Sequence, residues 1–402
     1  MDVTSRPRNR LDAAREAIAA HLDEFIALRH DIHQYPELAF HEHRTSRLVA
    51  SKLASWGYDV TTGIARTGVV ATLPPRGEGR RRLAIRADMD ALPIEEATGG
   101  LDYASRNKGV MHACGHDGHT TILLAAARYL AEEGDFSGTL DLVFQPAEEI
   151  GAGARKMISE GLFEQFPVDA VFGLHNWPGV TAGRFGFVNG PAMASVDKAV
   201  IKIVGKGGHG AEPHNAVDPV VAAASLITAL QSIVSRNVDP REMAVVTVGS
   251  IHGGEASNVI PGSVELQLTI RSYSEEVRRG LQVRIPALAR AQAESFGGVA
   301  EVDYRLGFPS VINPVEETAF ARKVAADAFG GDDVLEGAFA PRTASEDFAF
   351  LLQAKPGSYL FIGNGDSAPL HSAEYNFNDQ IIAPAALYWV QLAEAFLNEN
   401  RR

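Results

Sequence analysis

The order of strand-like and helix-like segments is the sequence feature that most restricts the fold. Short apolar runs at residues 83–87, 138–145 and 168–176 are typical of buried strands. Between the first two runs, residues 120–134 have the apolar spacing of a helix and end in a glycine. Strands that alternate with helices in this way predict an α/β layer with a largely parallel sheet.

From about residue 188 the pattern changes. Residues 197–208 alternate like a strand with one solvent-facing side, and residues 218–234 form a predicted helix with Pro219 near its start. Two strands follow, then a second helix with an expected kink or break at Pro286, then a last strand. This β-α-β-β-α-β order is that of the ferredoxin-like unit.

The length of the chain allows the two patterns to be separate domains, because 402 residues are too many for one simple core. We expect a mostly parallel-sheet domain formed by residues 1–187 and 307–402. A ferredoxin-like α+β domain is expected to be inserted at residues 188–306. A composition of 46% hydrophobic and 22% charged residues is that of a globular protein and gives no case for disorder.

Charge and cysteine content restrict the partners and the compartment. Acidic residues outnumber basic ones by 50 to 37, so nucleic acid and anionic membranes are not expected as partners. One cysteine cannot form an internal disulfide, and the N-terminal region lacks the apolar core of a signal peptide. No stretch is expected to span a bilayer. A cytoplasmic protein is therefore expected.

Candidate metal ligands lie at or soon after the ends of the predicted strands. In open α/β sheets, ligands bind in the crevice beyond the carboxyl ends of the strands. Side chains that are distant in sequence can therefore gather at one rim of the sheet. The candidates with this placement are Asp88, Asp90, Glu148, Glu149, His175 and His371.

Cys114, the only cysteine, lies two residues before His116 and just ahead of a predicted helix. In an extended or turning segment both side chains can face one point, and the helix N-terminus favours a thiolate. Metal ligation is the favoured interpretation. Two others remain: a small buried residue, or a nucleophile with His112, His116 or His119 as its base. If Cys114 is not a nucleophile, His119 is expected only to start the helix, and His112 has no assigned role.

The adjacent Glu148 and Glu149 can take different roles, because neighbouring side chains in an irregular segment project in different directions. One can bind a metal while the other acts as a general base on water. The alternative is a solvated acidic pair before the next helix. His175 and His371 are each weak candidates alone, since histidines in a core are usually satisfied by hydrogen bonds, and each gains from following a predicted strand.

The predicted inserted domain holds three further candidates. His209 lies in a glycine-rich loop, where it either donates a hydrogen bond to a developing oxyanion or is simply exposed in a turn. Arg271 ends a strand, and its guanidinium matches a substrate carboxylate as well as it matches a surface ion pair. Asn258 lies at the start of the same predicted hairpin.

Several of these segments resemble motifs of the M20 metallopeptidase family. The segments "RADMDALPIEE", "MHACGHDGHTT", "QPAEE", "HNWPG", "GKGGHGAEPH", "SNVIP", "SEDF" and "LHSAEYNFND" occur here in that family's order. They are most similar to its amidohydrolase branch, which includes hippurate hydrolases and indole-acetyl-amino-acid hydrolases. The resemblance extends from about His30 to Asp379, and the cysteine-histidine segment with the double glutamate is specific to that branch.

The resemblance implies a di-metal catalytic domain with two divalent ions, most often manganese or zinc, with nickel or cobalt also compatible. Glu148 would be the general base. Asp88 lies where many relatives carry a metal-binding histidine, so Asp88 and Asp90 are expected to surround the ligands rather than to bind metal. The implied ligands are Cys114, His116, Glu149, His175 and His371.

For the inserted domain, the resemblance implies a lid and a dimerisation surface, and hence a homodimer. His209 would match a histidine that stabilises the transition state and that comes from the partner subunit in dimeric relatives. Arg271 and Asn258 would match groups near the substrate carboxylate. Gly210 and Leu268 depart from the family's pattern, where alanine and glycine are expected.

The function that these residues and the resemblance favour is metal-dependent hydrolysis of an N-acyl amino acid, a small-molecule substrate. Acetyl, benzoyl and indole-acetyl groups all remain open as the acyl part. The alternatives are a metallo-dipeptidase or carboxypeptidase of the same family, an amidase that uses Cys114 as nucleophile, and a relative that binds metal without catalysis.

Overall fold

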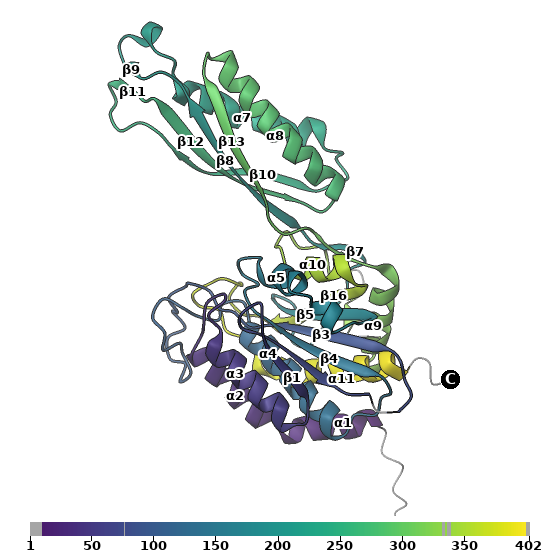
Figure 1. Cartoon of the computed structure of the whole chain (residues 1–402). Coiled ribbons are helices and arrows are strands. Elements are labelled where there is room, and N and C mark those ends of the chain that lie inside the picture. Colours follow the sequence, from purple (N-terminus) through teal and green to yellow (C-terminus); the bar gives the residue numbers. More distant parts are fainter. Residues whose placement is uncertain (1–9, 76, 332–333, 336–338, 399–402) are drawn as a thin grey trace, which may run out of the picture. The chain divides into compact units, whose positions relative to one another are not determined.

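The structure is a computed structural model that describes residues 10–75, 77–331, 334–335 and 339–398. Along the chain it divides into two compact units (Figure 1). The larger unit comprises Met1–Gly190, Asn313–Ala340 and Phe350–Arg402. The smaller unit comprises Pro191–Ile312 and Pro341–Ala349. The sequence analysis had assigned the second of these segments to the larger domain.

An eight-stranded sheet forms the framework of the larger unit. Its strands, in spatial order, are β1 (Asp59–Ile64), β2 (Gly68–Leu73), β4 (Thr139–Gln145), β3 (Arg82–Asp88), β5 (Ala170–Pro178), β16 (Gly357–Gly365), β6 (Phe185–Gly186) and β15 (Val334–Leu335). The four central strands β4, β3, β5 and β16 are parallel neighbours, whereas β1, β2 and β6 join by antiparallel pairing. The predicted α/β class is confirmed, with a mixed sheet whose centre is parallel.

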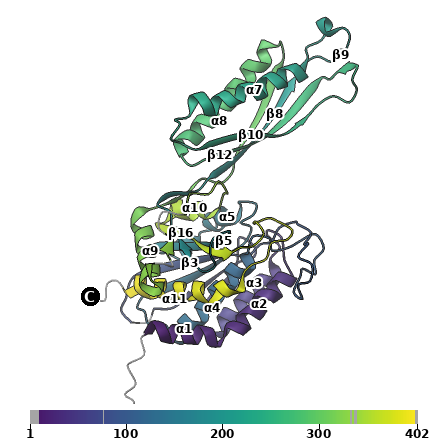
Figure 2. The same ribbon diagram turned by 180° about the vertical axis from the view of Figure 1, so that it is seen from behind.

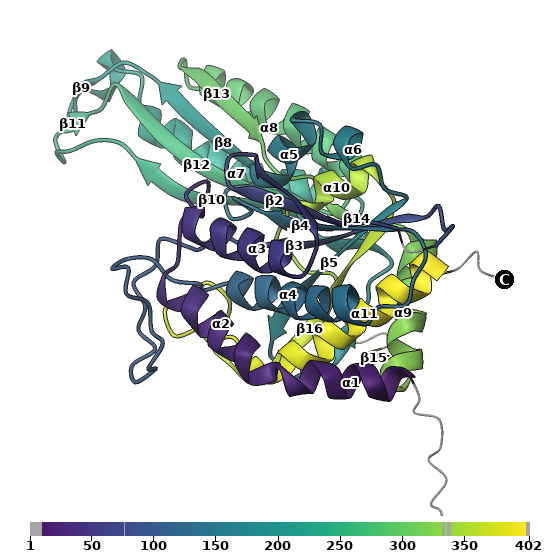
Figure 3. The same ribbon diagram turned by 60° about the horizontal axis from the view of Figure 1, so that its bottom comes forward.

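One face of this sheet is covered by helices that share its main core. These helices are α1 (Arg10–Ala20), α2 (Leu22–Gln34), α3 (His43–Ser55), α4 (His116–Glu132), α9 (Val315–Phe329) and α11 (Ile382–Asn398). Figure 3 shows α4 and α11 side by side across the sheet. The remaining helices of this unit are the short α5 (Gly153–Ser159) and α6 (Leu162–Gln165). A further short helix, α10 (Phe348–Ala354), begins in the second segment of the smaller unit and continues in the larger one.

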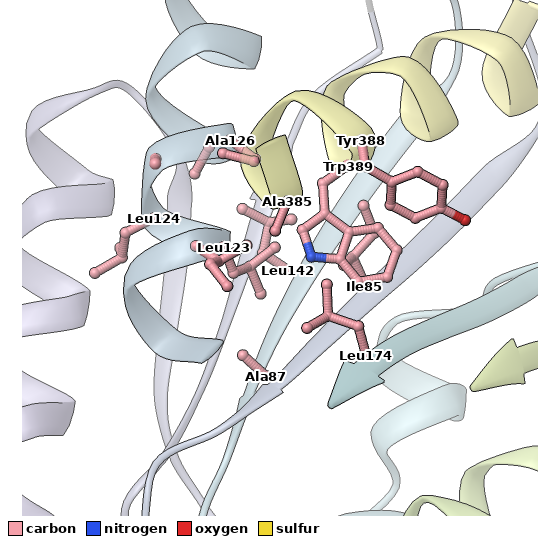
Figure 4. Packing of buried hydrophobic residues seen from close by; sticks show 14 of the residues in the cluster. Ile85, Ala87, Leu123, Leu124, Ala126, Leu142, Leu174, Ala385, Tyr388 and Trp389 are labelled. Carbon is pink, nitrogen blue, oxygen red and sulfur yellow. The ribbon is translucent and has the colours of Figure 1, made fainter. Parts of the chain in front are cut away.

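The central strands are nearly continuous in apolar residues because they are buried in this core. In Figure 4, Ile85 of β3 and Leu142 of β4 lie against Leu123 of α4 and Trp389 of α11. All four side chains are buried. Because helices and loops cover the strands, their apolar side chains leave water, and each such burial stabilises the fold by roughly 1.5–3 kcal/mol. The packed sheet holds the ends of β3, β4 and β5 in fixed register.

The smaller unit has the predicted β-α-β-β-α-β order. Figure 2 shows this unit from behind. Its antiparallel sheet consists, in spatial order, of β10 (Ala244–His252), β12 (Ser263–Ser272), β8 (Ser195–Val204) and β13 (Val299–Leu306). Alternate residues of β8 and β12 pack against α7 (Pro219–Asn237) and α8 (Glu275–Ser295). Of the kink or break expected at Pro286, the break is wrong, because α8 runs through this residue without interruption.

Shorter strands complete the smaller unit and its connections. β9 (Gly208–His209) pairs with β11 (Val259–Ile260) in a separate ladder. The short strands β7 (Gly190–Met193) and β14 (Val311–Asn313) lie where the chain passes between the units.

Among the residues that the structure describes, two helices are long and apolar enough, by length and composition alone, to cross a membrane: α7 and the segment Asp379–Asn398. The sequence analysis expected no such stretch. The core helices of globular units meet the same criterion, and α7 and α11 both contribute side chains to buried cores. These helices are therefore weak evidence for a membrane span. The first nine residues, part of the region expected to lack a signal peptide, lie outside the described residues.

Candidate metal centre and active site

The predicted ligands of the larger unit converge at one rim of its sheet. His175 lies in the carboxyl-terminal half of β5, and Glu148 and Glu149 lie in the turn after β4. Three sets, each with ligand atoms within 4.8 Å of one another, link the whole group. The sets are Cys114–His116–His175, Cys114–Glu149–His371 and His116–Glu148–Glu149.

The start of α4 brings Cys114 and His116 into this cluster. Between them, Gly115 has a φ of 93°, a left-handed conformation that glycine adopts without strain. A Cβ on Gly115 would lie 2.3 Å from Oδ1 of Asn176, so the backbone approaches the end of β5 more closely than a side chain allows. Cys114 Sγ consequently lies 3.4 Å from His175 Nε2.

His371 reaches the cluster from a distant part of the sequence. Its backbone N–H donates to the carbonyl of Ala113 at 2.8 Å, which ties the loop after β16 to the segment before α4. His371 has a φ of 63°, an uncommon conformation for a residue with a side chain. Its Nε2 lies 3.5 Å from Oε2 of Glu149, and Oε1 of the same carboxylate lies 3.8 Å from His116 Nε2.

The unsatisfied atoms of this cluster fit a bound cation. His116 Nε2 and Glu149 Oε1 are buried and have no hydrogen-bond partner among the described residues. Buried polar atoms normally have such a partner. The other ring nitrogens are oriented by backbone carbonyls: His116 Nδ1 lies 2.9 Å from the oxygen of Asp90, and His175 Nδ1 lies 2.6 Å from that of Asn176. Each Nε2 is thereby turned toward the cluster, where it would face a bound metal.

The donor chemistry indicates a divalent transition metal. One thiol, three imidazoles and one carboxylate form a mixed set of sulfur, nitrogen and oxygen atoms, which suits zinc and several neighbouring divalent ions. We find that the residues present fit such ions. The side chains that would hold them are those predicted from the sequence, namely Cys114, His116, Glu149, His175 and His371.

The protonation equilibria of the cluster also favour a cation over a free thiolate. Burial raises the pKa of the Cys114 thiol, and the charges of Glu149 and Glu148 raise it further. Burial likewise raises the pKa of Glu149, to about 7. Burial lowers the pKa of His116, but Asp88, Asp90 and Glu149 outweigh it and raise this pKa to about 10. The anionic forms are therefore unfavourable beside one another unless a cation compensates them.

Asp88 and Asp90, which were expected to surround the ligands, lie beside the cluster. The carboxylate of Asp90 accepts the backbone N–H groups of Glu148 and Glu149, each at 3.0 Å. The carboxylate of Asp88 accepts from buried Arg86 at 2.6 Å and from His119 Nδ1 at 2.7 Å. Asp88 Oδ2 also lies 3.7 Å from His116 Nε2, so this carboxylate borders the cluster.

The sequence analysis offered His119 as a possible base for Cys114 or as the start of the helix, and it missed the supporting role that the structure gives this residue. The ring is buried, and its Nε2 lies 2.8 Å from Asn176 Oδ1, so it joins the end of β3 to the end of β5. The available signal was its spacing: residues i and i+3 share a helix face, and His119 is three residues after His116.

A second set of buried side chains contacts the first turn of α4. Asp117 is fully buried, and its Oδ2 lies 2.8 Å from His33 Nδ1 and 3.3 Å from the Arg29 guanidinium. Burial lowers the pKa of His33, but Asp117 and Glu96 outweigh it and raise this pKa to about 9. These contacts anchor the residue that follows His116.

The candidates of the smaller unit do not form one group within it. His209 pairs with Val259, and Gly210 N–H donates to the carbonyl of Asn258 at 2.8 Å, so His209 and Asn258 are neighbours. Arg271 lies near the other end of β12. At the rise per residue of an extended strand, it is about 25 Å from the end of β12 that follows Asn258 in the sequence. A Cβ on Gly210 would lie 3.0 Å from the Asn258 carbonyl, so this departure from the family's alanine allows the close approach.

Arg271 contacts the second segment of the smaller unit. It donates to the carbonyl of Thr343 at 2.9 Å and to Ser345 Oγ at 2.7 Å. Within the described part of the chain, no carboxylate forms a salt bridge with it. Partial burial lowers its pKa. Leu268, the second departure from the family's pattern, lies in the core of the same unit.

Comparisons with known proteins identify the family. Residues 84–395 match the family model described as Peptidase family M20/M25/M40. The hippurate hydrolase of Campylobacter jejuni is 44% identical, covering 93% of this chain and 97% of the relative. The N-acetyl-L-cysteine deacetylase of Bacillus subtilis is 42% identical, covering 94% and 89%. The IAA-amino acid hydrolase ILR1-like 4 of Arabidopsis thaliana is 38% identical, covering 94% and 86%.

A solved structure agrees with these sequence relatives. The Bacillus subtilis YXEP protein, described as a dinuclear metal binding peptidase from the M20 family, superposes with a TM-score of 0.82 at 33% identity. The alignment covers 94% of this chain and 99% of that one. The α/β fold, the metal-binding character and the amidohydrolase class expected from the sequence are thereby confirmed. This chain belongs to the M20 peptidase family, as an amidohydrolase that acts on linear amides.

Proposed function

We propose that this protein hydrolyses the amide bond of N-acyl amino acids to give a carboxylate and a free amino acid. The observation that carries the proposal is that Glu148 and the five candidate metal ligands converge at the rim of the sheet. The relatives named for hippurate, N-acetyl-L-cysteine and IAA-amino acids support a substrate that joins an acyl group to an amino acid.

Glu148 is the residue to which we assign proton transfer. Two divalent ions bound by the five ligands would supply Lewis acidity to water and to the amide carbonyl. Glu148 is largely buried and belongs to the same cluster as His116 and Glu149. It would take a proton from the attacking water and deliver it to the leaving nitrogen as the carbon–nitrogen bond breaks.

The smaller unit would contribute substrate contacts. We assign the substrate carboxylate to Arg271, because its guanidinium has free capacity for a bidentate contact. We assign stabilisation of the oxyanion to His209 and place Asn258 beside it. The distance between His209 and Arg271 within one unit supports a homodimer, in which the two groups serve a site from different subunits.

An amidase that uses Cys114 as its nucleophile is the alternative from another class. Such an enzyme needs a thiolate and a basic histidine beside it. Burial raises the pKa of Cys114 and lowers that of His175, its nearest ring nitrogen. Both shifts disfavour this mechanism.

Metal removal and thiol alkylation separate the two proposals. Hippurate, N-acetyl-cysteine, indole-acetyl amino acids and dipeptides are assayed after dialysis against EDTA, with manganese, zinc, cobalt or nickel restored in turn. We expect activity to be lost on dialysis, to return with at least one metal, and to favour an N-acyl amino acid over dipeptides. Full activity after EDTA together with loss under iodoacetamide would exclude the metal mechanism.

A further inference from the structure

We propose that Glu42, a buried carboxylate outside the ligand set, is a positioning residue that holds the turn carrying Glu148 and Glu149. The inference deepens the proposed function and rests on the role assigned there to Glu148. It concerns the larger unit alone, because Glu42, the turn and every contact between them belong to that unit.

The turn after β4 has a backbone that needs external support. Ala147 has a φ of 54°, in the left-handed region, which is unfavourable for a residue with a side chain. Its carbonyl accepts the N–H groups of Ala152 at 3.2 Å and Gly153 at 3.1 Å. A Cβ on Gly153 would lie 1.6 Å from the carbonyl oxygen of Pro146, so the turn folds back tightly on itself. A conformation of this kind persists only where surrounding groups determine it.

Glu42 supplies one of these groups. Its Oε1 accepts the N–H of Ala147 at 2.9 Å and the N–H of Phe40 at 3.0 Å. Its Oε2 accepts the hydroxyl of Thr67 at 2.5 Å. Glu42 and Ala147 are both inaccessible to solvent. Burial raises the pKa of Glu42 to about 7, and a carboxyl oxygen accepts the Ala147 N–H in either protonation state, so this contact holds the amide.

Glu42 and Asp90 together hold three successive amides. The N–H of Ala147 ends on Glu42, and the N–H groups of Glu148 and Glu149 end on Asp90. The preceding residue, Pro146, has no N–H to place. Every backbone donor from Pro146 to Glu149 is therefore absent or bound to a buried carboxylate. The direction in which the Glu148 side chain leaves the backbone is set by these contacts.

Glu42 is not explained by a role in its own helix. It is the N-cap residue of α3, yet its side chain accepts no hydrogen bond from that helix. The amides at the start of α3 are instead bound by Glu37, which accepts from Arg44 at 2.8 Å and from Thr45 at 2.9 Å. The Glu42 carboxylate is thus directed to the catalytic turn, while Glu37 serves the helix. Glu37 provides a matched control.

The first test measures the turn directly, without substrate and in metal-depleted protein. Hydrogen–deuterium exchange is followed in peptides that contain residues 145–150. In Glu42→Ala we expect about tenfold faster exchange at this turn. In Glu42→Gln we expect exchange close to that of the wild type, because the amide oxygen can still accept from Ala147. Glu37→Ala should leave this peptide unchanged and accelerate only the start of α3.

The second test measures catalysis with the N-acyl amino acid that the wild type hydrolyses fastest, at saturating metal. Displacing a catalytic group by about 1 Å can cost 10²-fold, so we expect Glu42→Ala to lower kcat roughly 10- to 100-fold while KM changes little. Glu42→Gln should recover most of kcat, and Glu37→Ala should stay within about threefold of the wild type.

Each outcome has a distinct meaning. If Glu42→Ala matches Glu37→Ala in both exchange at the turn and kcat, the positioning role is wrong. If Glu42→Ala does not fold, Thr67→Val replaces it, since it removes the donor to Oε2 with little change of shape. Wild-type exchange and kcat in Thr67→Val would then overturn the inference. A wild-type protein that hydrolyses no N-acyl amino acid contradicts the proposed function, whereas the exchange experiment still tests the contact.

Discussion

At the scale of single residues, buried side chains outside the candidate ligand set hold the backbone that carries it: Glu42 accepts the N–H of Ala147, and Asp117 lies 2.8 Å from His33 Nδ1. The five candidate ligands could be proposed from the sequence, because each lies near the end of a strand or the start of a helix and because the family resemblance implied the set. The supporting contacts could not, since nothing near Glu42 or His33 in the sequence indicates a contact with Ala147 or Asp117. Such contacts depend on tertiary packing, which local patterns do not record.

The buried pair of His33 and Asp117 gives the folded state a dependence on pH. The pKa of His33 is about 9 in the folded protein, against 6.5 for the free side chain. The stabilisation is fully present below about pH 6.5 and is lost as the pH rises through 9, which amounts to roughly 3 kcal/mol. The free energy of unfolding of metal-depleted wild type, minus that of His33→Gln, should decrease across this window. A difference that is flat between pH 6 and 10 would contradict the ion pair.

At the scale of elements, the junction between the cysteine segment and α4 determines whether the ligands can meet. The sequence predicted the helix but not its first residue, because the predicted boundary ignored the left-handed conformation of Gly115. The uninterrupted α8 shows the converse, since its expected break at Pro286 followed from local propensity and tertiary packing overrode it.

Replacing Gly115 with alanine should destabilise this junction by more than the strain of its left-handed backbone conformation alone. The new Cβ meets Asn176 Oδ1 at 2.3 Å, and the φ of 93° adds strain. We expect a lower melting temperature and at least tenfold weaker metal binding, measured by competition with a chelator. Gly57→Ala is the control, because Gly57 has a φ of 89° with nothing within 4 Å of an added Cβ. Equal effects of the two variants would show that the close approach is unimportant.

At the scale of the whole molecule, the fold class and the insertion could be predicted because hydrophobic periodicity changes where one unit gives way to the other. The return of residues 341–349 to the smaller unit could not be predicted, since a short irregular segment carries no periodic signal. The proposed homodimer likewise depends on surfaces that sequence patterns do not specify.

Mixing two inactive variants tests whether His209 acts across a dimer. Glu148→Gln lacks the proposed base, and His209→Ala lacks the proposed oxyanion donor. After subunit exchange, half of the dimers are mixed and one of their two sites is intact, so about a quarter of wild-type activity should return. No recovery in a confirmed mixed dimer would place His209 in the site of its own subunit, and a monomer in light scattering would contradict the dimer itself.

The central claim is that Glu148 transfers the proton at a site whose metals are held by other side chains. The most direct measurement is kcat for hydrolysis of an N-acyl amino acid by Glu148→Gln, with the metal content of the same sample counted. We predict a fall of roughly 10²–10⁴-fold in kcat, with metal content equal to that of the wild type. Turnover at the wild-type rate with full metal content would contradict the account.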